Sequence, residues 1–301
     1  MYNQFFGLQE DPFSLTSNPR FMFMPWKQSQ AMAGLAYALL SRKRCIILTG
    51  DIGAGKTTLV AAARQRLPAD RVQFSLISNP TFASGELLEA ALLGFELEEF
   101  PDDRPGRLAA LERFVGHGQT QGRTSVIVID EAQKLSMDSL EEVRLLGNIE
   151  FLQIVLVGQN ELRQLIDKPE AREFKQNAVH LTLQPLSTEE VEQYISYRWN
   201  KAGGAQTPFS SDAIQTVERY SRGTPRLINV ICDNALIFAY RDQTPIVSAQ
   251  HISAAACCLK LPDLSEANLQ TMVDKVPRAE PRNGVALLRP VDSTGTPTLS
   301  H

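Results

Sequence analysis

One glycine-rich segment limits the folds open to this chain more than any other feature: Gly50-Asp51-Ile52-Gly53-Ala54-Gly55-Lys56-Thr57-Thr58. Its spacing, a glycine, four residues and then Gly-Lys-Thr, is that of a phosphate-binding loop between a strand and a helix. Such glycines let backbone N–H groups turn toward phosphates, and the helix N-terminus adds a positive dipole end. The segment therefore predicts a nucleotide-binding site. The alternative, a chance glycine-rich turn, fits the predicted flanking strand and helix less well.

Two side chains of this loop have predicted roles in binding ATP with Mg²⁺. Lys56 is expected to reach the β- and γ-phosphates, and the hydroxyl of Thr57 is expected to bind Mg²⁺. Without nucleotide we expect Lys56 to face solvent, so that its replacement leaves the fold intact.

A second motif joins an apolar run, Ser125-Val126-Ile127-Val128-Ile129, to two carboxylates, Asp130 and Glu131. The run predicts a buried strand, and ligands of open α/β sheets bind beyond the carboxyl ends of such strands. There Asp130 would hold Mg²⁺ through water, and Glu131 would polarise the attacking water. This pair distinguishes ATPases from P-loop kinases. The alternative is that both carboxylates only cap the next helix.

Two further polar residues are candidates for the catalytic site. Gln159 lies just past an apolar strand predicted over 153–157 and would orient water beside the γ-phosphate, unless it is only a loop glutamine. Arg226 follows Gly223-Thr224-Pro225 in the first turn of a predicted helix. It either reaches back to the γ-phosphate or is a surface arginine, and spacing alone does not decide.

The hydrophobic pattern predicts an α/β fold whose parallel five-stranded sheet has helices on both faces. Strands are expected at 45–49, 72–77, 125–130, 153–157 and 179–183, with helices at 28–42, 57–66, 84–93, 107–114, 139–146 and 161–166. After Pro185 only helices are expected, at 188–201, 211–221, 225–240 and 248–259, with Ser187 and Glu190 as the start signal. We therefore divide the chain into an N-terminal segment with the first helix (1–43), a nucleotide-binding core (44–185), a small all-helical lid domain (186–260) and a tail expected to be disordered (261–301).

Charge and hydropathy favour a cytoplasmic protein that is not a dedicated nucleic-acid binder. The net charge is −4, and the one tight basic cluster, Arg42-Lys43-Arg44, is more simply a solvated helix end. The N-terminus has no basic region before an apolar run, so no secretory signal is expected. The longest apolar stretch, 31–40, is about half a membrane span.

The same motifs, followed by a helical domain, resemble the AAA+ ATPases. The sequence between these motifs is also similar to the general secretion pathway protein A (ExeA-like) family and to its relatives from exosortase and exopolysaccharide loci. This similarity covers about residues 1–260. The similar segments are Phe5-Phe6-Gly7-Leu8, Pro12-Phe13, Pro19-Arg20-Phe21, Asp130-Glu131-Ala132-Gln133, Glu141-Glu142-Val143-Arg144-Leu145-Leu146, Val157-Gly158-Gln159 and Pro225-Arg226-Leu227-Ile228-Asn229. The resemblance implies that Gln159 is sensor 1, that Arg226 is sensor 2 and that Pro12-Phe13 lies near the adenine. Packing alone would explain Phe13 as well.

The chain departs from the pattern of this family in three places. Family members usually continue into a transmembrane segment and a peptidoglycan-binding region, and this chain is several residues shorter between Asn148 and Phe151. Where the family usually carries arginines, the stretch before the last strand reads Lys175-Gln176-Asn177-Ala178-Val179-His180. In AAA+ rings a neighbouring subunit supplies an arginine finger to the phosphoryl group. Arg172 is the nearest candidate for such a finger. Because the usual arginines are missing from this stretch, the isolated protein is expected to hydrolyse ATP slowly.

Three functions are compatible with these features. The favoured one is a cytoplasmic, homo-oligomeric ATPase that drives or regulates a cell-envelope secretion or exopolysaccharide export system through membrane-associated partners, as the resemblance implies. The second is a DNA-associated AAA+ ATPase of the transposition-accessory type, which only the basic cluster supports. The third is a slow nucleotide-dependent switch that binds ATP and a partner.

Overall fold

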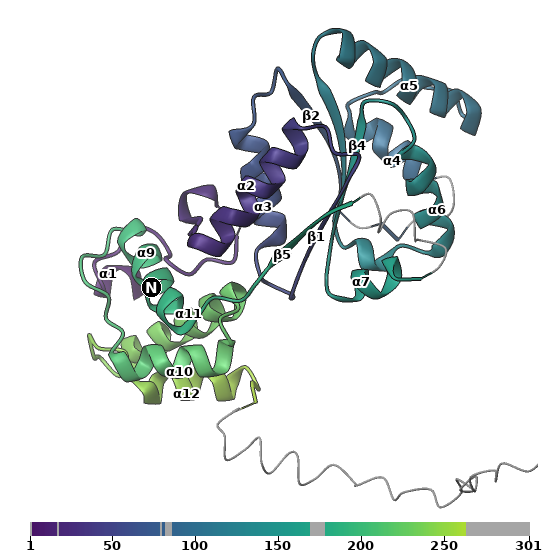
Figure 1. Cartoon of the computed structure of the whole chain (residues 1–301). Helices are drawn as coiled ribbons and strands as arrows, with labels where there is room; N and C mark the ends of the chain where they lie inside the picture. Colours follow the sequence, from purple (N-terminus) through teal and green to yellow (C-terminus); the bar gives the residue numbers. More distant parts are fainter. Residues whose placement is uncertain (1, 17, 79, 82–85, 169–177, 263–301) are drawn as a thin grey trace, which may run out of the picture. The chain divides into compact units, whose positions relative to one another are not determined.

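Five parallel strands form one sheet in the order β2-β3-β4-β1-β5 (Figure 1). They are β1 (Cys45–Gly50), β2 (Val72–Ile77), β3 (Thr124–Ile129), β4 (Leu152–Gly158) and β5 (Ala178–Leu183). The central strands β1, β3 and β4 are buried along their whole length, so their sequences are continuous apolar runs rather than alternating patterns. The computed structural model describes residues 2–16, 18–78, 80–81, 86–168 and 178–262.

Helices cover both faces of the sheet (Figure 1). On one face lie α2 (Trp26–Leu40) and α3 (Lys56–Arg66); on the other lie α4 (Glu86–Gly94), α5 (Arg104–Thr120), α6 (Met137–Leu146) and α7 (Glu161–Ile166). This arrangement confirms the predicted α/β class and the parallel five-stranded sheet. The helix predicted over 107–114 is longer, since α5 begins at Arg104 and continues through Gly116 and Gly118 to Thr120 despite the weak helix propensity of glycine.

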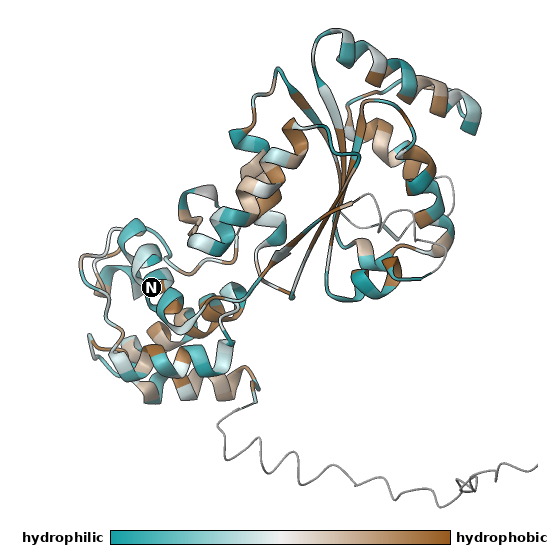
Figure 2. Cartoon of the chain, in the orientation of Figure 1, coloured by the Kyte–Doolittle hydropathy of each residue, from teal (hydrophilic) through white to brown (hydrophobic). Residues whose placement is uncertain are grey.

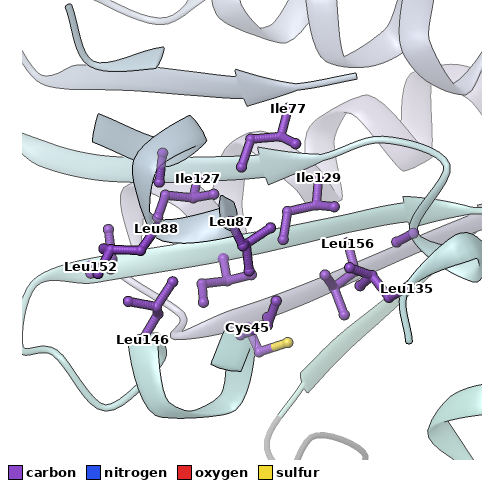
Figure 3. Packing of buried hydrophobic residues seen from close by; sticks show 14 of the residues in the cluster. Cys45, Ile77, Leu87, Leu88, Ile127, Ile129, Leu135, Leu146, Leu152 and Leu156 are labelled. Atoms are coloured by element: carbon purple, nitrogen blue, oxygen red, sulfur yellow. The ribbon is translucent and has the colours of Figure 1, made fainter. Parts of the chain in front are cut away.

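Each face of the sheet has its own hydrophobic core, and the strands are the most apolar elements of this region (Figure 2). The core beneath α4 to α7 is shown in Figure 3, where Ile127 and Ile129 of β3 and Leu152 and Leu156 of β4 lie among the side chains of Leu87 and Leu88. Burying these side chains holds the strands in register, and register fixes which residues emerge together at the carboxyl edge.

Four helices follow the sheet: α9 (Thr188–Lys201), α10 (Ser211–Ser221), α11 (Pro225–Arg241) and α12 (Ala249–Cys258). The predicted start signal is a capping box, in which Ser187 Oγ accepts from the Glu190 N–H at 3.3 Å and Glu190 Oε2 accepts from the Ser187 N–H at 2.9 Å. Among the described residues no helix is long and apolar enough to cross a bilayer.

The N-terminal segment packs with these four helices rather than with the sheet. Tyr2, Leu8, Phe13 and Phe21 belong to one buried core with residues of α9 to α12. This segment includes α1 (Tyr2–Phe5) and a short 3-10 helix, η1 (Pro19–Phe21). Because α2 belongs to a core of the sheet, the chain passes between the two cores twice, near residues 21–24 and again near residues 183–186.

Candidate nucleotide-binding site

The loop after β1 has the backbone that a phosphate cradle requires. Gly53 has φ +78° and Gly55 has φ +95°, left-handed conformations that favour glycine. Gly50 is needed for a different reason, because a Cβ atom there would lie 2.7 Å from the carbonyl oxygen of Leu183. Helix α3 begins at Lys56, so its N-terminal N–H groups and dipole lie at the loop.

A cavity of about 430 Å³ opens beside this loop. That volume lies within the usual range for small-molecule sites. The loop contributes Ile52 to Thr58, whereas Gly50 and Asp51 are not part of the wall. The remaining wall combines Glu131 with residues from the N-terminal segment, α2, α3, the end of β5, α9 and α11: Ser14, Leu15, Thr16, Asn18, Phe21, Met22, Phe23, Met24, Gln28, Leu59, Leu183, Leu186, Tyr194, Arg198, Pro225, Arg226 and Asn229.

Lys56 is buried, and the expectation that it faces solvent without ligand is wrong. Its side chain is 6% exposed, and Nζ donates to the carbonyl oxygens of Gly50 and Asp51, each at 2.9 Å. Burial lowers the pKa of Lys56, while the nearby carboxylates of Glu131 and Asp130 raise it. Carbonyl oxygens of the loop thus satisfy the buried ammonium group of Lys56.

Thr57 and Asp130 come together although 73 positions separate them. Thr57 Oγ1 donates to Asp130 Oδ2 at 2.5 Å, and Asp130 Oδ1 accepts from the Glu131 N–H at 2.8 Å. A hydroxyl and a carboxylate are oxygen ligands of the kind that Mg²⁺ prefers, usually together with water and substrate phosphates. The donor set therefore fits the predicted metal.

The carboxylate of Glu131 lies in a polar network rather than at a helix cap. Glu131 Oε2 accepts from Gln133 Nε2 at 2.7 Å and from Gln159 Nε2 at 3.4 Å. Gln133 Oε1 in turn accepts from the Gln159 N–H at 3.1 Å. Glu131 precedes a short 3-10 helix, η2 (Ala132–Lys134), without any side-chain cap, and α6 is capped by Ser136 instead. The capping alternative for Asp130 and Glu131 thus has no support in the geometry.

Arg226, in the first turn of α11, belongs to the cavity wall. Its backbone N–H donates to the Gly53 carbonyl at 3.3 Å, and a Cβ atom on Gly53 would lie only 2.6 Å from Arg226 Cβ. The side chain is exposed within the cavity wall. The first turn of α11 and the phosphate loop are therefore in direct contact.

Phe13 packs in the core, and it is not in the wall of the cavity. It is 1% exposed and makes an edge contact with Phe209. The residues after it do reach the cavity, because buried Arg198 holds the segment by donating to the carbonyls of Pro12 at 2.5 Å and Ser14 at 3.2 Å. Ser14, Leu15 and Thr16, rather than Pro12 and Phe13, therefore belong to the cavity wall.

Sequence patterns did not single out three residues that shape this site. Gln133 lay within a similar segment but had no assigned role. Asn160 Nδ2 donates to Asp51 Oδ1 at 2.7 Å, and Arg163 on α7 donates to Thr49 Oγ1 at 3.0 and 3.1 Å and to Thr182 Oγ1. For Asn160 and Arg163 the available signal was closeness to Gln159, which they follow by one and four positions.

Some predicted features are placed elsewhere or lie outside the described residues. Arg42, Lys43 and Arg44 are all exposed between α2 and β1, as expected for a solvated helix end. Arg172 and the stretch 175–177 lie outside the described residues, as does the expected tail beyond residue 262.

Comparison with known proteins agrees with this geometry. A model of an AAA domain family matches residues 39–166. General secretion pathway protein A from Aeromonas hydrophila is 38% identical over 266 residues, which cover 85% of this chain and 48% of that protein. The chain thus spans about half the length of this curated relative.

Two solved structures illustrate the similarity in fold. Cdc6p from Pyrobaculum aerophilum superposes with a TM-score of 0.64 at 18% identity, covering 87% of this chain and 74% of that one. A Walker-type ATPase of Pyrococcus abyssi gives a TM-score of 0.59 at 15% identity, covering 89% and 81% of the two chains. At such low identity these similarities concern the fold alone.

Proposed function

Since this chain belongs to the AAA+ P-loop NTPases and is related to general secretion pathway protein A, we propose that it binds Mg-ATP in the cavity beside Gly50–Thr58 and hydrolyses it. The hydrogen bond between Thr57 and Asp130 carries this proposal. It joins the phosphate loop to the end of β3 at the point where a metal ligand set is needed.

Each polar residue of the site has a proposed part in the reaction. Lys56 releases its two loop carbonyls and donates to the β- and γ-phosphates. Glu131, held by Gln133, accepts a proton from the attacking water, and Gln159 donates to that water or to the γ-phosphate. Thr57 and, through water, Asp130 would hold Mg²⁺, which would neutralise phosphate charge.

Thr57→Val tests the proposed metal ligand. We expect ATP affinity in the presence of Mg²⁺ to fall by about 10- to 100-fold, because one charge-assisted oxygen contact is worth roughly 1.5–3 kcal/mol. Titration of a fluorescent ATP analogue with Mg²⁺ and with EDTA measures the effect. Thr57→Ser keeps the hydroxyl and is the matched control. Equal Mg²⁺ dependence in the valine and serine variants would remove Thr57 from the site.

Arg226→Ala tests the proposed sensor of the γ-phosphate. We expect ATP affinity to fall by about 10- to 100-fold with little change for ADP, because the lost contact is a charge-assisted hydrogen bond to the terminal phosphate. Paired titrations with ADP and a non-hydrolysable ATP analogue give the ratio. Arg241→Ala, at the exposed far end of the same helix, should leave it unchanged. An unaltered ATP-to-ADP ratio in Arg226→Ala would make Arg226 a structural contact of Gly53 only.

For the cellular role we propose that ATP turnover drives or regulates assembly of a cell-envelope secretion or exopolysaccharide export system. The support is the relationship to general secretion pathway protein A, which the chain matches over about half of that protein's length. We further propose a homo-oligomer acting from the cytoplasm on membrane-associated partners. A pull-down with ATP and with ADP, followed by identification of the retained proteins, tests this role. Retention of DNA alone would favour the transposition-accessory alternative.

A further inference from the structure

Gln28, in α2, belongs to the wall of the cavity, and its side chain carries an unsatisfied buried acceptor. Its side chain is 7% exposed, and Nε2 donates to the backbone carbonyl of Gln184 at 3.4 Å. The other amide atom, Oε1, is buried and accepts no hydrogen bond from any residue that the structure describes. Buried acceptors are normally satisfied, so this oxygen is suited to a donor that arrives with a ligand.

The contact with Gln184 fixes which way the amide of Gln28 faces. Turning the amide over would bring Oε1 against the Gln184 carbonyl oxygen, and two acceptors would then oppose each other. The unpaired atom of this amide is therefore the acceptor Oε1, while Nε2 faces the Gln184 carbonyl. A donor on the ligand gains a hydrogen bond, whereas an acceptor placed there is repelled.

The surroundings of Gln28 suit the base of a nucleotide rather than its phosphates. Met22 and Met24 precede α2, and Leu183 and Leu186 flank Gln184; all four belong to the cavity wall. Apolar side chains of this kind cover the faces of a flat heteroaromatic ring, with a few polar groups fixing its orientation. The charged groups for phosphate, Lys56 above all, belong to the phosphate loop instead.

We propose that Gln28 selects adenine, with Oε1 accepting a hydrogen bond from the exocyclic 6-amino group. A 6-oxopurine presents a carbonyl oxygen at the same place and is rejected, because the Gln184 carbonyl prevents the amide from turning to meet it. This assignment rests on the proposed function, since it requires a nucleotide in this cavity. It makes Gln28 a specificity-determining residue outside the phosphate loop and the two carboxylates.

Calorimetric titration of the full chain with ADP and with inosine diphosphate isolates this contact. The two ligands differ only in the 6-oxo group and the accompanying N1 proton. The wild type is expected to bind ADP about 10- to 100-fold more tightly, as expected when one buried polar group is left facing the wrong partner. In Gln28→Met and Gln28→Ala the preference should fall to about twofold or less. Gln30→Ala, an exposed glutamine on the same helix, should keep the wild-type ratio.

The ratio of affinities is measured within each variant, so a loss of folded protein affects both ligands equally. Gln28→Met keeps the side-chain volume and guards against collapse of the wall. A wild type that binds ADP and inosine diphosphate equally, or a Gln28→Met variant that keeps the full preference, overturns the assignment while leaving nucleotide binding intact. A wild type that binds neither ligand overturns the proposed function itself.

Discussion

Glu131→Gln is expected to bind Mg-ATP as tightly as the wild type and to hydrolyse it about 10²- to 10⁴-fold more slowly, the usual contribution of a general base. Glutamine has the same size as glutamate, and its side-chain oxygen can still accept from Gln133 and Gln159. What it loses is the capacity to take a proton in the transition state. Phosphate release under saturating ATP, together with a binding titration, measures the two properties separately.

The matched control for this substitution is Glu141→Gln, which changes an exposed glutamate of α6 that pairs with Arg144 and lies outside the cavity wall. Its turnover should equal that of the wild type. If Glu131→Gln also turned over at the wild-type rate, Glu131 would be a structural partner of Gln133 and another group would activate the water.

Lys56→Ala is expected to weaken ATP binding by about 100-fold. Hydrogen bonds to charged groups contribute roughly 1.5–3 kcal/mol each, and part of this gain is offset because Lys56 must first leave the carbonyls of Gly50 and Asp51. A titration with a fluorescent ATP analogue gives the affinity.

Because Lys56 is buried, thermal melting without nucleotide must accompany that titration. Lys56→Met keeps most of the side-chain volume and separates loss of the charge from loss of packing. Lys27→Ala, an exposed lysine in the first turn of α2, is the control and should bind ATP normally. Wild-type affinity in a well-folded Lys56→Met protein would contradict phosphate binding by this loop.

The spacing of hydrophobic residues, together with residues typical of turns and helix starts, predicts most of this fold. The strands occur within a residue or two of the predicted ranges, because each central strand is buried on both faces, and α9 starts at the predicted capping box. The boundaries of α5 were less predictable, since glycines inside a helix weaken the local pattern while packing on β3 maintains it.

The candidate site was predictable only where motifs are local. The loop is one contiguous segment and the two carboxylates are neighbours in a second, so the chemistry of each motif is visible in the sequence. Three features depend on residues brought together by the tertiary structure: the hydrogen bond from the Gln159 N–H to Gln133, the burial of Lys56, and the contact of Gln28 with Gln184. No spacing rule reports such contacts.

The two passages of the chain between the sheet and the helical core have a mechanical consequence. A rigid body that is joined to another at two points rotates without strain only about the line through those points. The helical core is therefore expected to rotate relative to the sheet mainly about the line that joins the two passages. Gln28 lies just after the first passage and Gln184 lies in the second, and their hydrogen bond fastens the two together. The Gln28 amide, which we assign to the base, thus lies close to the axis of this rotation. A ligand bound there changes the relative rotation of the two cores little by moving, and mainly by making the hinge stiffer.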